Sequence, residues 1–443
     1  MLLSSVKMVQ QTRNSCYSKH MPTLHVTGGI PLSGTLTIAG RKNAALKLIA
    51  ASILSDKPVY LDHVPNIADV RTMLEILQTM GAEAEWVGDS KLRLNTSAVT
   101  EPVIPHDLGR KLRASLVLVG PLLARFKHVT FPHPGGCVIG KRTITPHLQA
   151  FEQLGANIEF DGTTYVMQAE RLAGRRIYLK ERSVTGTENL IMASTRAAGT
   201  TTIIWAAEES HITNLCDLLR TMGFDVTGDG TSTITVKGQP ELVTSEARCT
   251  VIPDEIEVGT FAAAALVTGG DVILEQVGSY VQVAPILSKL EDFNAQFTYD
   301  EGNQRLRLMP STSLTATSIQ TNPWPGFPPD LQSPFTVLAT QAAGTSLIQD
   351  WMYEGRLYFT DLLQKMGANI VICDPHRALV TGPTKLYRAQ SITPDLRAGA
   401  ALIVAALAAE GTSEIEHAEL IDRGYMDIEQ RLRSIGATIS REG

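Results

Sequence analysis

Apolar and polar positions repeat along this 443-residue chain with a period of about 70 residues. Each repeat contains an apolar helix pattern that ends in a short tag, centred on glycine in five of the six copies. The tags are Met80-Gly81-Ala82, Leu154-Gly155-Ala156, Met222-Gly223-Phe224, Phe293-Asn294-Ala295, Met366-Gly367-Ala368 and Ile435-Gly436-Ala437. This period exceeds the roughly 20 to 50 residues of solenoid repeats. The sequence therefore predicts six small subdomains, each containing helices and strands.

The pattern inside a repeat predicts two kinds of helix separated by a strand. The first helix is rich in small apolar residues, as in residues 43–54 and 398–409, which predicts burial on most sides. β-Branched strands follow turns at residues 200–204, 346–348 and 413–415. The second helix is amphipathic, with apolar residues at i, i+3, i+4, i+7 and i+10. This stripe reads Val70, Met73, Leu74, Leu77 and Met80 in the first repeat, and Val283, Ile286, Leu287, Leu290 and Phe293 in the fourth.

The alternation of helices and strands predicts an α/β (α+β) fold of six βαβαββ-like repeats, three in each of two domains. We expect residues 42–252 to form domain II. Residues 21–41, which begin with a strand-like run at residues 23–26, would join residues 253–443 in domain I. Residues 1–20 are polar and lack the apolar core of a secretory signal, so we expect a disordered extension outside the fold.

Composition narrows the class of protein. The formal net charge of −6 and the pI near 6.0 argue against nucleic-acid binding. The longest apolar stretches, around residues 116–124 and 398–409, are shorter than the roughly 20 residues that cross a bilayer, so no membrane association is expected. Five widely spaced cysteines without a CxxC pair are typical of a reducing compartment. The sequence is compatible with a monomer and leaves the oligomeric state open.

Charged residues appear where the repeats stop being alike. The amphipathic helix is predicted to start ten residues before each tag, at an apolar residue in five repeats and at Arg356 in the fifth. Lys42, Arg113 and Arg397 stand at helix N-termini, against the preference of the helix dipole for negative charge. An anionic ligand shared with the helix end would explain these cations. Arg356 reaching solvent from a helix end is an equally open interpretation.

The acidic residues at helix starts and the glycine-rich segment at residues 133–142 each allow two interpretations. Asp330 and Asp395 are either reactive carboxylates or ordinary helix caps. Cys137, among three glycines and near Arg142, is either a reactive thiol or a passive one. His133, Cys137 and His147 are too loosely spaced for zinc, so no metal is expected. The chain lacks GxxxxGK[ST], strand-bound GxGxxG, HExxH and GxSxG motifs, and we expect no cofactor.

Six motifs in order resemble the UDP-N-acetylglucosamine enolpyruvyl transferase (1-carboxyvinyltransferase) family, and the resemblance runs from about Thr23 to the C-terminus. The motifs are Gly40-Arg41-Lys42-Asn43-Ala44-Ala45, Leu112-Arg113-Ala114-Ser115, Pro134-Gly135-Gly136-Cys137-Val138-Ile139-Gly140, Phe327-Pro328-Pro329-Asp330-Leu331-Gln332, Asp395-Leu396-Arg397-Ala398 and Asp422-Arg423-Gly424-Tyr425. The resemblance implies two domains, each an inside-out α/β barrel of three repeats. It also implies transfer of the enolpyruvyl group of phosphoenolpyruvate to the sugar 3-hydroxyl of UDP-N-acetylglucosamine, with release of phosphate. That reaction is the first committed step of peptidoglycan precursor synthesis, in the cytoplasm.

The resemblance also implies a role for individual residues. Catalytic roles fall to Cys137, Asp330, Lys42, Asp395 and Arg397, with Asp330 as general base and Cys137 as acid. The phosphoenolpyruvate-binding residues would be Lys42, Arg142, Arg356, Arg397 and Arg423. The UDP-sugar-binding residues would be Asn43, Arg113, Ser183, Val184, Thr185, Glu209, Asp330 and Met352.

Departures from the family pattern and two alternatives remain. Thr145-Pro146 and Glu181 replace residues that contact the nucleotide in the family, and they bear on affinity for the UDP-sugar. One alternative is a transferase like 5-enolpyruvylshikimate-3-phosphate synthase, although that enzyme lacks the loop cysteine and prefers Lys-Ser where this chain has Lys42-Asn43. The other is a catalytically silent homologue that binds UDP-sugar.

Overall fold

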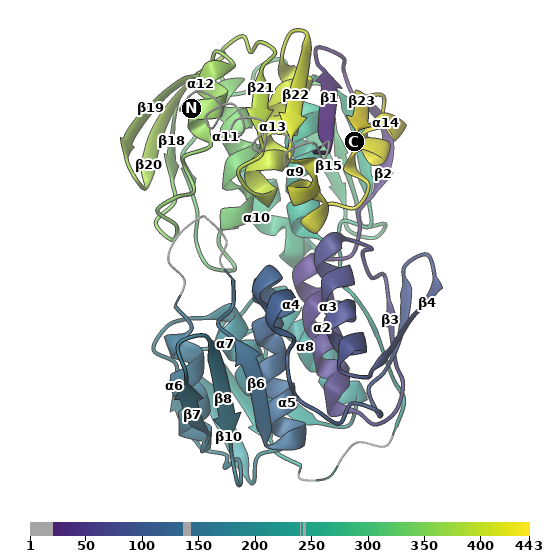
Figure 1. Ribbon diagram of the computed structural model, residues 1–443. Helices are drawn as coiled ribbons and strands as arrows, with labels where there is room; N and C mark the ends of the chain where they lie inside the picture. The colour runs from purple at the N-terminus through teal and green to yellow at the C-terminus, as the bar shows by residue number, and fades with distance from the viewer. Residues whose placement is uncertain (1–20, 136–142, 240, 242–244) are drawn as a thin grey trace, which may run out of the picture.

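The computed structural model describes residues 21–135, 143–239, 241 and 245–443, which form two stacked lobes (Figure 1). The lower lobe holds the described elements from α2 (Lys42–Ala51) to β13 (Ala247–Thr250), and the upper lobe holds β1 (Thr23–Thr27), β2 (Ser33–Thr37) and the elements from α9 (Glu255–Val267) to β23 (Thr438–Glu442). Each lobe has a separate hydrophobic core, one built from residues between Ala44 and Val251 and the other from Leu24 to Ile38 together with Ile256 to Ile439. The predicted domain boundaries remain a prediction, which this separation of cores supports.

The lower lobe alternates helices and strands along the chain. Its elements are α2 (Lys42–Ala51), η1 (Ser52–Leu54), β3 (Val59–Asp62), α3 (Ala68–Thr79), β4 (Glu83–Gly88), β5 (Lys91–Asn95), α4 (His106–Lys111), η2 (Arg113–Leu118), α5 (Val119–Phe126), β6 (His128–Pro132), α6 (Thr145–Leu154), β7 (Asn157–Phe160), β8 (Thr164–Gln168), β9 (Arg176–Tyr178), α7 (Val184–Ser194), β10 (Thr200–Ile204), α8 (Ser210–Thr221), β11 (Asp225–Thr227), β12 (Thr233–Lys237) and β13 (Ala247–Thr250).

The upper lobe repeats this alternation after two N-terminal strands. Its elements are β1 (Thr23–Thr27), β2 (Ser33–Thr37), α9 (Glu255–Val267), β14 (Asp271–Glu275), α10 (Tyr280–Asp292), β15 (Phe297–Asp300), β16 (Arg305–Leu308), β17 (Ile319–Gln320), η3 (Pro329–Leu331), α11 (Gln332–Thr340), β18 (Gly344–Gln349), α12 (Thr360–Lys365), β19 (Asn369–Asp374), β20 (Arg377–Gly382), β21 (Gln390–Ile392), α13 (Leu396–Ala408), β22 (Thr412–Glu416), η4 (Ala418–Arg423), α14 (Ile428–Ser434) and β23 (Thr438–Glu442).

Six sheets, counted over the described residues, share one strand order. A parallel strand flanks the central strand, whose other edge pairs with an antiparallel hairpin, as in β17-β18-β20-β19. In the sheet β6-β8-β7 a single parallel bridge between Val103 and Thr130 takes the place of the parallel strand. In the last sheet β1 supplies one hairpin strand by pairing with both β22 and β23. The repeated order confirms the predicted α/β fold of six related units.

Small-residue helices form the centre of each lobe, as the sequence predicts. In the upper lobe α9, α11 and α13 contact one another and are buried along nearly their whole length. In the lower lobe α2, η2, α5 and α7 take this inner place. The amphipathic helices α3 and α10 lie outside and bury their predicted stripes, from Val70 to Met80 and from Val283 to Phe293. The sheets face outward and the small-residue helices lie inside, which gives the inside-out arrangement.

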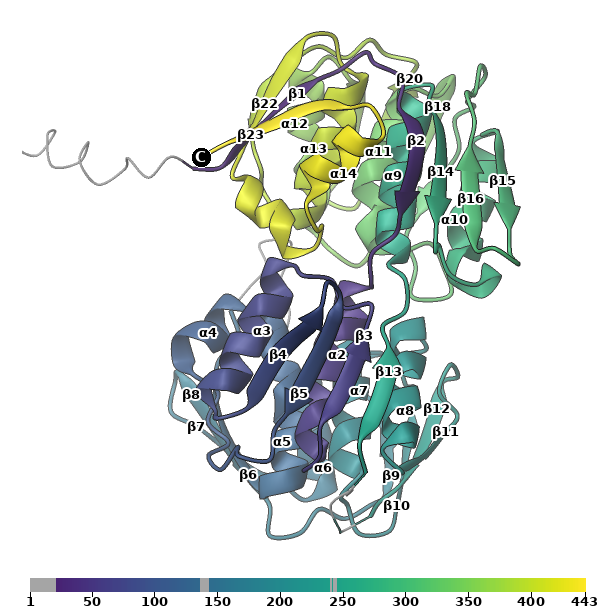
Figure 2. The same cartoon turned by 90° about the vertical axis from the view of Figure 1, so that its right-hand side faces the viewer.

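Two adjacent chain segments connect the lobes (Figure 2). The first leads from β2 to α2 and the second from β13 to α9, and they form an antiparallel bridge between Gly40 and Pro253. Backbone hydrogen bonds of 2.8 Å from Arg41 to Ile252 and 2.9 Å from Asp254 to Ala39 join them. A Cβ atom at Gly40 would lie 1.8 Å from the carbonyl oxygen of His63, so only glycine allows this close approach.

The predicted helix starts miss by three or four residues in the last three repeats. In the fourth repeat α10 begins earlier, at Tyr280 instead of Val283, and in the fifth and sixth repeats the helices begin later than predicted. Arg356 lies in a turn four residues before α12 begins at Thr360, and α14 begins only at Ile428. The physical reason in the fifth repeat is local. The Asp350 carboxylate accepts hydrogen bonds from the backbone N–H groups of Met352 and Tyr353, and this side-chain turn competes with helix formation. Arg356 therefore points into the protein instead of along a helix surface.

Candidate active site

Asp330, in the short helix η3, binds two arginines of the upper lobe. Its Oδ1 accepts a 3.0 Å hydrogen bond from Nη2 of Arg356, and its Oδ2 accepts one of 3.0 Å from Nε of Arg397. Both guanidinium groups are almost fully buried, while the Asp330 side chain is 34% exposed. Two buried cations therefore meet at one carboxylate that reaches solvent.

The surrounding side chains hold both arginines in place. Nε of Arg356 lies 3.8 Å from the fully buried carboxylate of Asp350, and the Arg356 guanidinium lies over the ring of Tyr353. The Arg397 guanidinium lies over the ring of Tyr425, whose hydroxyl hydrogen-bonds to Thr260 at 2.8 Å. Among the described residues nothing accepts a hydrogen bond from the buried Nη1 of Arg397. This donor suits an arriving anion, because guanidinium groups bind carboxylates in a bidentate manner.

Asp69, in the first turn of α3, binds two further cations that come from different lobes. Its Oδ2 accepts a 3.0 Å hydrogen bond from Nζ of Lys42, in the lower lobe. Its Oδ1 accepts a 2.9 Å hydrogen bond from Nε of Arg423, at the end of η4 in the upper lobe. In both views α3 lies directly beneath the part of the upper lobe that carries η4 (Figures 1 and 2).

The two clusters are electrostatically linked. Burial raises the pKa of Asp330, but the positive charges of Arg397, Arg356 and, from the other lobe, Lys42 outweigh it and hold that pKa well below its usual range. Burial likewise raises the pKa of Asp69, and Lys42 and Arg423 more than compensate, so its pKa is also lowered. Both carboxylates are therefore ionised at neutral pH, between cations from both lobes.

A second group of buried charges involves Arg41 and Lys47, which lie just before and within the helix α2 that Lys42 begins. Arg41 pairs with Glu255 and donates a 2.8 Å hydrogen bond to Ser210. Deeper in the lower lobe, the Glu188 carboxylate lies 3.6 Å from Nζ of Lys47 and 3.2 Å from Nε2 of His211. Burial raises the pKa of Glu188 to about 7 and lowers that of Lys47.

Most residues predicted to bind the UDP-sugar lie at helix N-termini of the lower lobe. Asn43 follows Lys42 in α2, Arg113 begins η2, and Glu209 precedes α8. Ser183 caps α7, where its Oγ accepts a 3.2 Å hydrogen bond from the backbone N–H of Gly186, and Val184 and Thr185 begin that helix. Helix N-termini carry partial positive charge and unpaired N–H groups, which suit a diphosphate.

Asp395 and Met352, two predicted site residues of the upper lobe, lie in different settings, and only Asp395 has a structural role. Asp395 caps α13, since its Oδ1 accepts hydrogen bonds of 2.8 and 3.2 Å from the backbone of Arg397 and Ala398. This is the helix-cap interpretation of Asp395, and it also fixes the start of the helix that carries Arg397. Met352 lies in the turn before Arg356 with its side chain exposed.

Cys137 and Arg142 lie outside the described residues, so the predictions for them stay predictions. Within the described ranges, no group of three or more His, Cys, Asp or Glu side chains is arranged to hold a metal ion. No helix in that part of the chain is long and apolar enough to cross a membrane. Cys216, Cys249 and Cys373 are free thiols.

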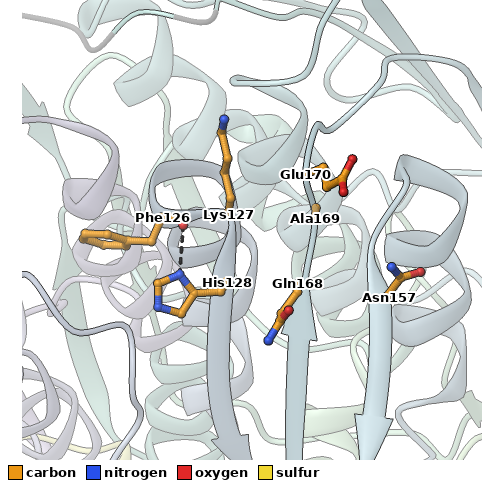
Figure 3. Close-up of a pocket in the computed structure, with 7 residues that line it drawn as sticks. All are labelled: Phe126, Lys127, His128, Asn157, Gln168, Ala169 and Glu170. Carbon is orange, nitrogen blue, oxygen red and sulfur yellow. Dashed lines mark hydrogen bonds between the residues drawn. The ribbon is translucent and has the colours of Figure 1, made fainter.

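A hollow at the end of the sheet β6-β8-β7 contains none of the predicted site residues (Figure 3). It is lined by Phe126, Lys127, His128, Asn157, Gln168, Ala169 and Glu170. The dashed contact is a 3.0 Å hydrogen bond between Nδ1 of His128 and the carbonyl oxygen of Phe126. The charged clusters between the lobes, not this hollow, therefore make up the candidate site.

Sequence reasoning missed Asp69 and Asp350. Asp69 stands one residue before the apolar stripe of α3, where an acidic residue is an ordinary partner of the helix dipole. Asp350 follows a strand, where it is a common turn residue. The sequence carries no signal that either side chain binds a cation, because those cations lie on other elements.

The family model that describes EPSP synthase (3-phosphoshikimate 1-carboxyvinyltransferase) matches residues 26–432 of the chain. Among curated relatives, the UDP-N-acetylglucosamine 1-carboxyvinyltransferase of Treponema denticola is 40% identical, covering 94% of this chain and 98% of that protein. UDP-N-acetylglucosamine 1-carboxyvinyltransferase 1 of Caldanaerobacter subterraneus is 41% identical, covering 93% of this chain and 97% of that protein.

Solved structures of similar fold include two with lower sequence identity. The enolpyruvyl transferase NikO from Streptomyces tendae matches with a TM-score of 0.85 and 24% identity, covering 96% of this chain and 99% of that chain. EPSP synthase from Acinetobacter baumannii matches with a TM-score of 0.74 and 18% identity, covering 95% of this chain and 100% of that chain. These likenesses show the two-domain α/β fold.

Proposed function

The chain belongs to the carboxyvinyltransferase family that includes EPSP synthase, and we propose that it transfers the enolpyruvyl group of phosphoenolpyruvate to the 3-hydroxyl of UDP-N-acetylglucosamine, releasing phosphate. The acceptor is inferred from the relatives at 40 and 41% identity, which carry that sugar nucleotide in their names.

The observation that carries the proposal is the meeting of four cations from both lobes around two carboxylates. Phosphoenolpyruvate has two anionic ends, a phosphate and a carboxylate, and needs two sets of cations at short separation. Lys42 and Arg423 meet at Asp69, and we assign them to the phosphate, with Arg142 as a third cation. Arg356 and Arg397 meet at Asp330, and we assign them to the carboxylate.

Asp330 is proposed as the general base, and its arginines explain how its basicity is controlled. In the absence of substrate, Arg356 and Arg397 bind only the Asp330 carboxylate. Their positive charge then holds the pKa of Asp330 low and makes Asp330 a weak base. A substrate carboxylate bound to the same arginines adds negative charge beside Asp330 and raises that pKa. Asp330 therefore becomes a better base only when phosphoenolpyruvate is in place, which couples proton removal from the sugar hydroxyl to substrate binding.

The proposed chemical steps give roles to Cys137 and Asp395. The sugar oxygen adds to C2 of phosphoenolpyruvate as its proton passes to Asp330, and Cys137 is proposed to protonate the methylene carbon. The resulting tetrahedral ketal then loses a methyl proton and phosphate, which restores the vinyl group on the sugar. We propose that Asp395 assists this proton transfer while it holds the start of α13 and therefore Arg397. No cofactor is required.

We propose that the UDP-sugar binds to the lower lobe. Asn43, Arg113, Ser183, Val184, Thr185 and Glu209 would hold it there, together with Asp330 and Met352 from the upper lobe. Contacts made by the nucleotide far from the reacting atoms supply binding energy that can bring the lobes together around them. We further propose that the reaction is the first committed step of peptidoglycan precursor synthesis in the cytoplasm.

A coupled assay of phosphate release tests the proposal. Phosphoenolpyruvate is supplied with UDP-N-acetylglucosamine or with shikimate 3-phosphate, and we expect phosphate with the first acceptor only. Release with shikimate 3-phosphate alone would move the chain to the other activity of the family. Tight binding of UDP-N-acetylglucosamine without phosphate release from either pair would indicate a catalytically silent homologue.

A further inference from the structure

Asp69 has no role in the chemistry assigned above, yet it is the described carboxylate that contacts both proposed phosphate-binding cations. The Asp69 side chain is only 8% exposed, and it contacts Nζ of Lys42 at 3.0 Å and Nε of Arg423 at 2.9 Å. Nη2 of Arg423 lies a further 3.5 Å from Oδ2. Lys42 and Arg423 are 381 residues apart in the chain and belong to different lobes, so the Asp69 carboxylate is what joins them.

This contact differs from an ordinary surface ion pair. A buried carboxylate is stable only when cations or hydrogen-bond donors surround it, so Asp69 and its two partners constrain one another. The lowered pKa of Asp69, where Lys42 and Arg423 overcome the effect of burial, agrees with a permanently charged group. Lysine carries three N–H donors and arginine five, so each cation can contact Asp69 and a phosphate at the same time.

The geometry also excludes a purely local role for Asp69 within α3. A carboxylate in the first turn of a helix commonly interacts with the helix N-terminus. The Asp69 oxygens contact two side chains from outside α3 instead, one at the start of α2 and one at the end of η4. Its position therefore serves the two cations.

We propose that Asp69 is a positioning residue for phosphoenolpyruvate, which brings Lys42 of one lobe and Arg423 of the other to a single place where they bind the substrate phosphate together. This inference rests on the proposed function, since it assumes that the anion bound there is that phosphate. In this proposal Asp69 acts through Lys42 and Arg423, which it contacts, and not on the reacting atoms. Without its charge, two cations in neighbouring lobes repel each other and separate, so the phosphate loses a preformed site.

The test is Asp69→Asn in the full chain, because asparagine keeps the size of the side chain and removes its charge. We expect the KM for phosphoenolpyruvate to rise about 10- to 100-fold, the size of loss that follows removal of a partner that orients a metal ligand, which is a comparable positioning role. Inhibition by inorganic phosphate should weaken by a similar factor. The affinity for UDP-N-acetylglucosamine should stay within about twofold, because the side chains that Asp69 contacts, Lys42 and Arg423, are not among the residues proposed to hold the UDP-sugar. Asp69→Glu should recover part of the loss, because it restores the charge.

Asp422→Asn is the matched control. Asp422 is the neighbour of Arg423 in η4 and forms an Asp–Arg pair of 2.7 Å with Arg441, away from Lys42 and Asp69. This variant removes one carboxylate from η4, the element that carries Arg423. The KM for phosphoenolpyruvate should not change. A wild-type or lower KM in Asp69→Asn would overturn the proposal. If Asp69→Asn weakened the binding of both substrates equally and lowered the melting temperature, Asp69 would have a structural role instead.

The test separates this proposal from the proposed function. If the wild-type protein releases no phosphate with UDP-N-acetylglucosamine, the proposed function fails at that point. Calorimetric binding of inorganic phosphate to the wild-type and Asp69→Asn proteins then decides the role of Asp69 by itself. Equal phosphate affinity in the two proteins would reject it, and weaker affinity in the variant would support it.

Discussion

Replacing Glu188 by glutamine should destabilise the lower lobe strongly. The Glu188 carboxylate is fully buried in α7, 3.6 Å from Nζ of Lys47 in α2 and 3.2 Å from Nε2 of His211 in α8. Glutamine keeps the shape of the side chain but leaves the Lys47 ammonium, 6% exposed, without its anion. Arg41 and Lys42 add further positive charge around it.

The magnitude follows from the two ways in which Lys47 can respond. It can stay charged without a partner, and breaking a buried ion pair in this way costs about 3 to 5 kcal/mol. It can instead release its proton, which costs about 5 kcal/mol at pH 7 for a lysine whose ordinary pKa is near 10.4. Glu188→Gln should therefore lower the free energy of unfolding by about 3 to 5 kcal/mol.

Removing the cation of this pair instead of the anion should lower the free energy of unfolding by less. With Lys47→Met, Glu188 loses its cation but can take up a proton, since burial already raises its pKa to about 7. We expect a loss of about 1 to 2 kcal/mol for this variant at pH 7. The double variant should be more stable than the sum of the two losses predicts, with a coupling of about 2 kcal/mol or more.

Urea unfolding followed by tryptophan fluorescence measures these values. Trp86 and Trp205 lie in the lower lobe, while Trp324 and Trp351 lie in the upper lobe. A background with Trp324→Phe and Trp351→Phe makes the signal report the lower lobe, which matters because two lobes need not unfold in one step. If the losses of the two single variants add up to the loss of the double variant within about 0.5 kcal/mol, a direct Lys47–Glu188 interaction is refuted.

Three further outcomes are expected. Because burial raises the folded-state pKa of Glu255 to about 7, above its unfolded value, the folded protein binds an extra proton there. The contribution of this group to stability is therefore present below about pH 4.5 and is lost as pH rises through about 7. Urea titrations at several pH values should show a smaller decline in Glu255→Gln than in the wild type. Arg356→Lys should raise the KM for phosphoenolpyruvate about tenfold or more with little change for the UDP-sugar, because lysine cannot bind a carboxylate in a bidentate manner; unchanged steady-state kinetics would contradict the assignment. Gly259→Ala should cost about 1 to 3 kcal/mol and lower kcat, since its Cβ would lie 2.5 Å from the Leu331 side chain, next to Asp330; thermal unfolding and initial rates check both effects, and a variant that matched wild type in both would show that Leu331 can move without Asp330.

The hydrophobic pattern by itself determined the secondary structure and the number of repeats. The apolar stripe of α3 repeats every three to four residues, so its buried face could be read from a single segment. β-Branched residues that follow a turn predict strands at residues 200–204 and 413–415, and the structure has β10 at Thr200–Ile204 and β22 at Thr412–Glu416. The same local reasoning failed at Arg356, where the Asp350 side chain replaces a helical turn.

The charged residues of the site divide in the same way. Lys42, Arg397 and Asp330 stood out because a charge occupied a helix start or belonged to a motif. Only the tertiary structure paired them, since Arg397 meets Asp330 from 67 positions away and Arg423 meets Asp69 from 354. Local periodicity reports which face of an element is buried, because neighbouring positions share one backbone geometry. It does not report which distant side chain approaches that face, because this depends on how the lobes and their helices pack.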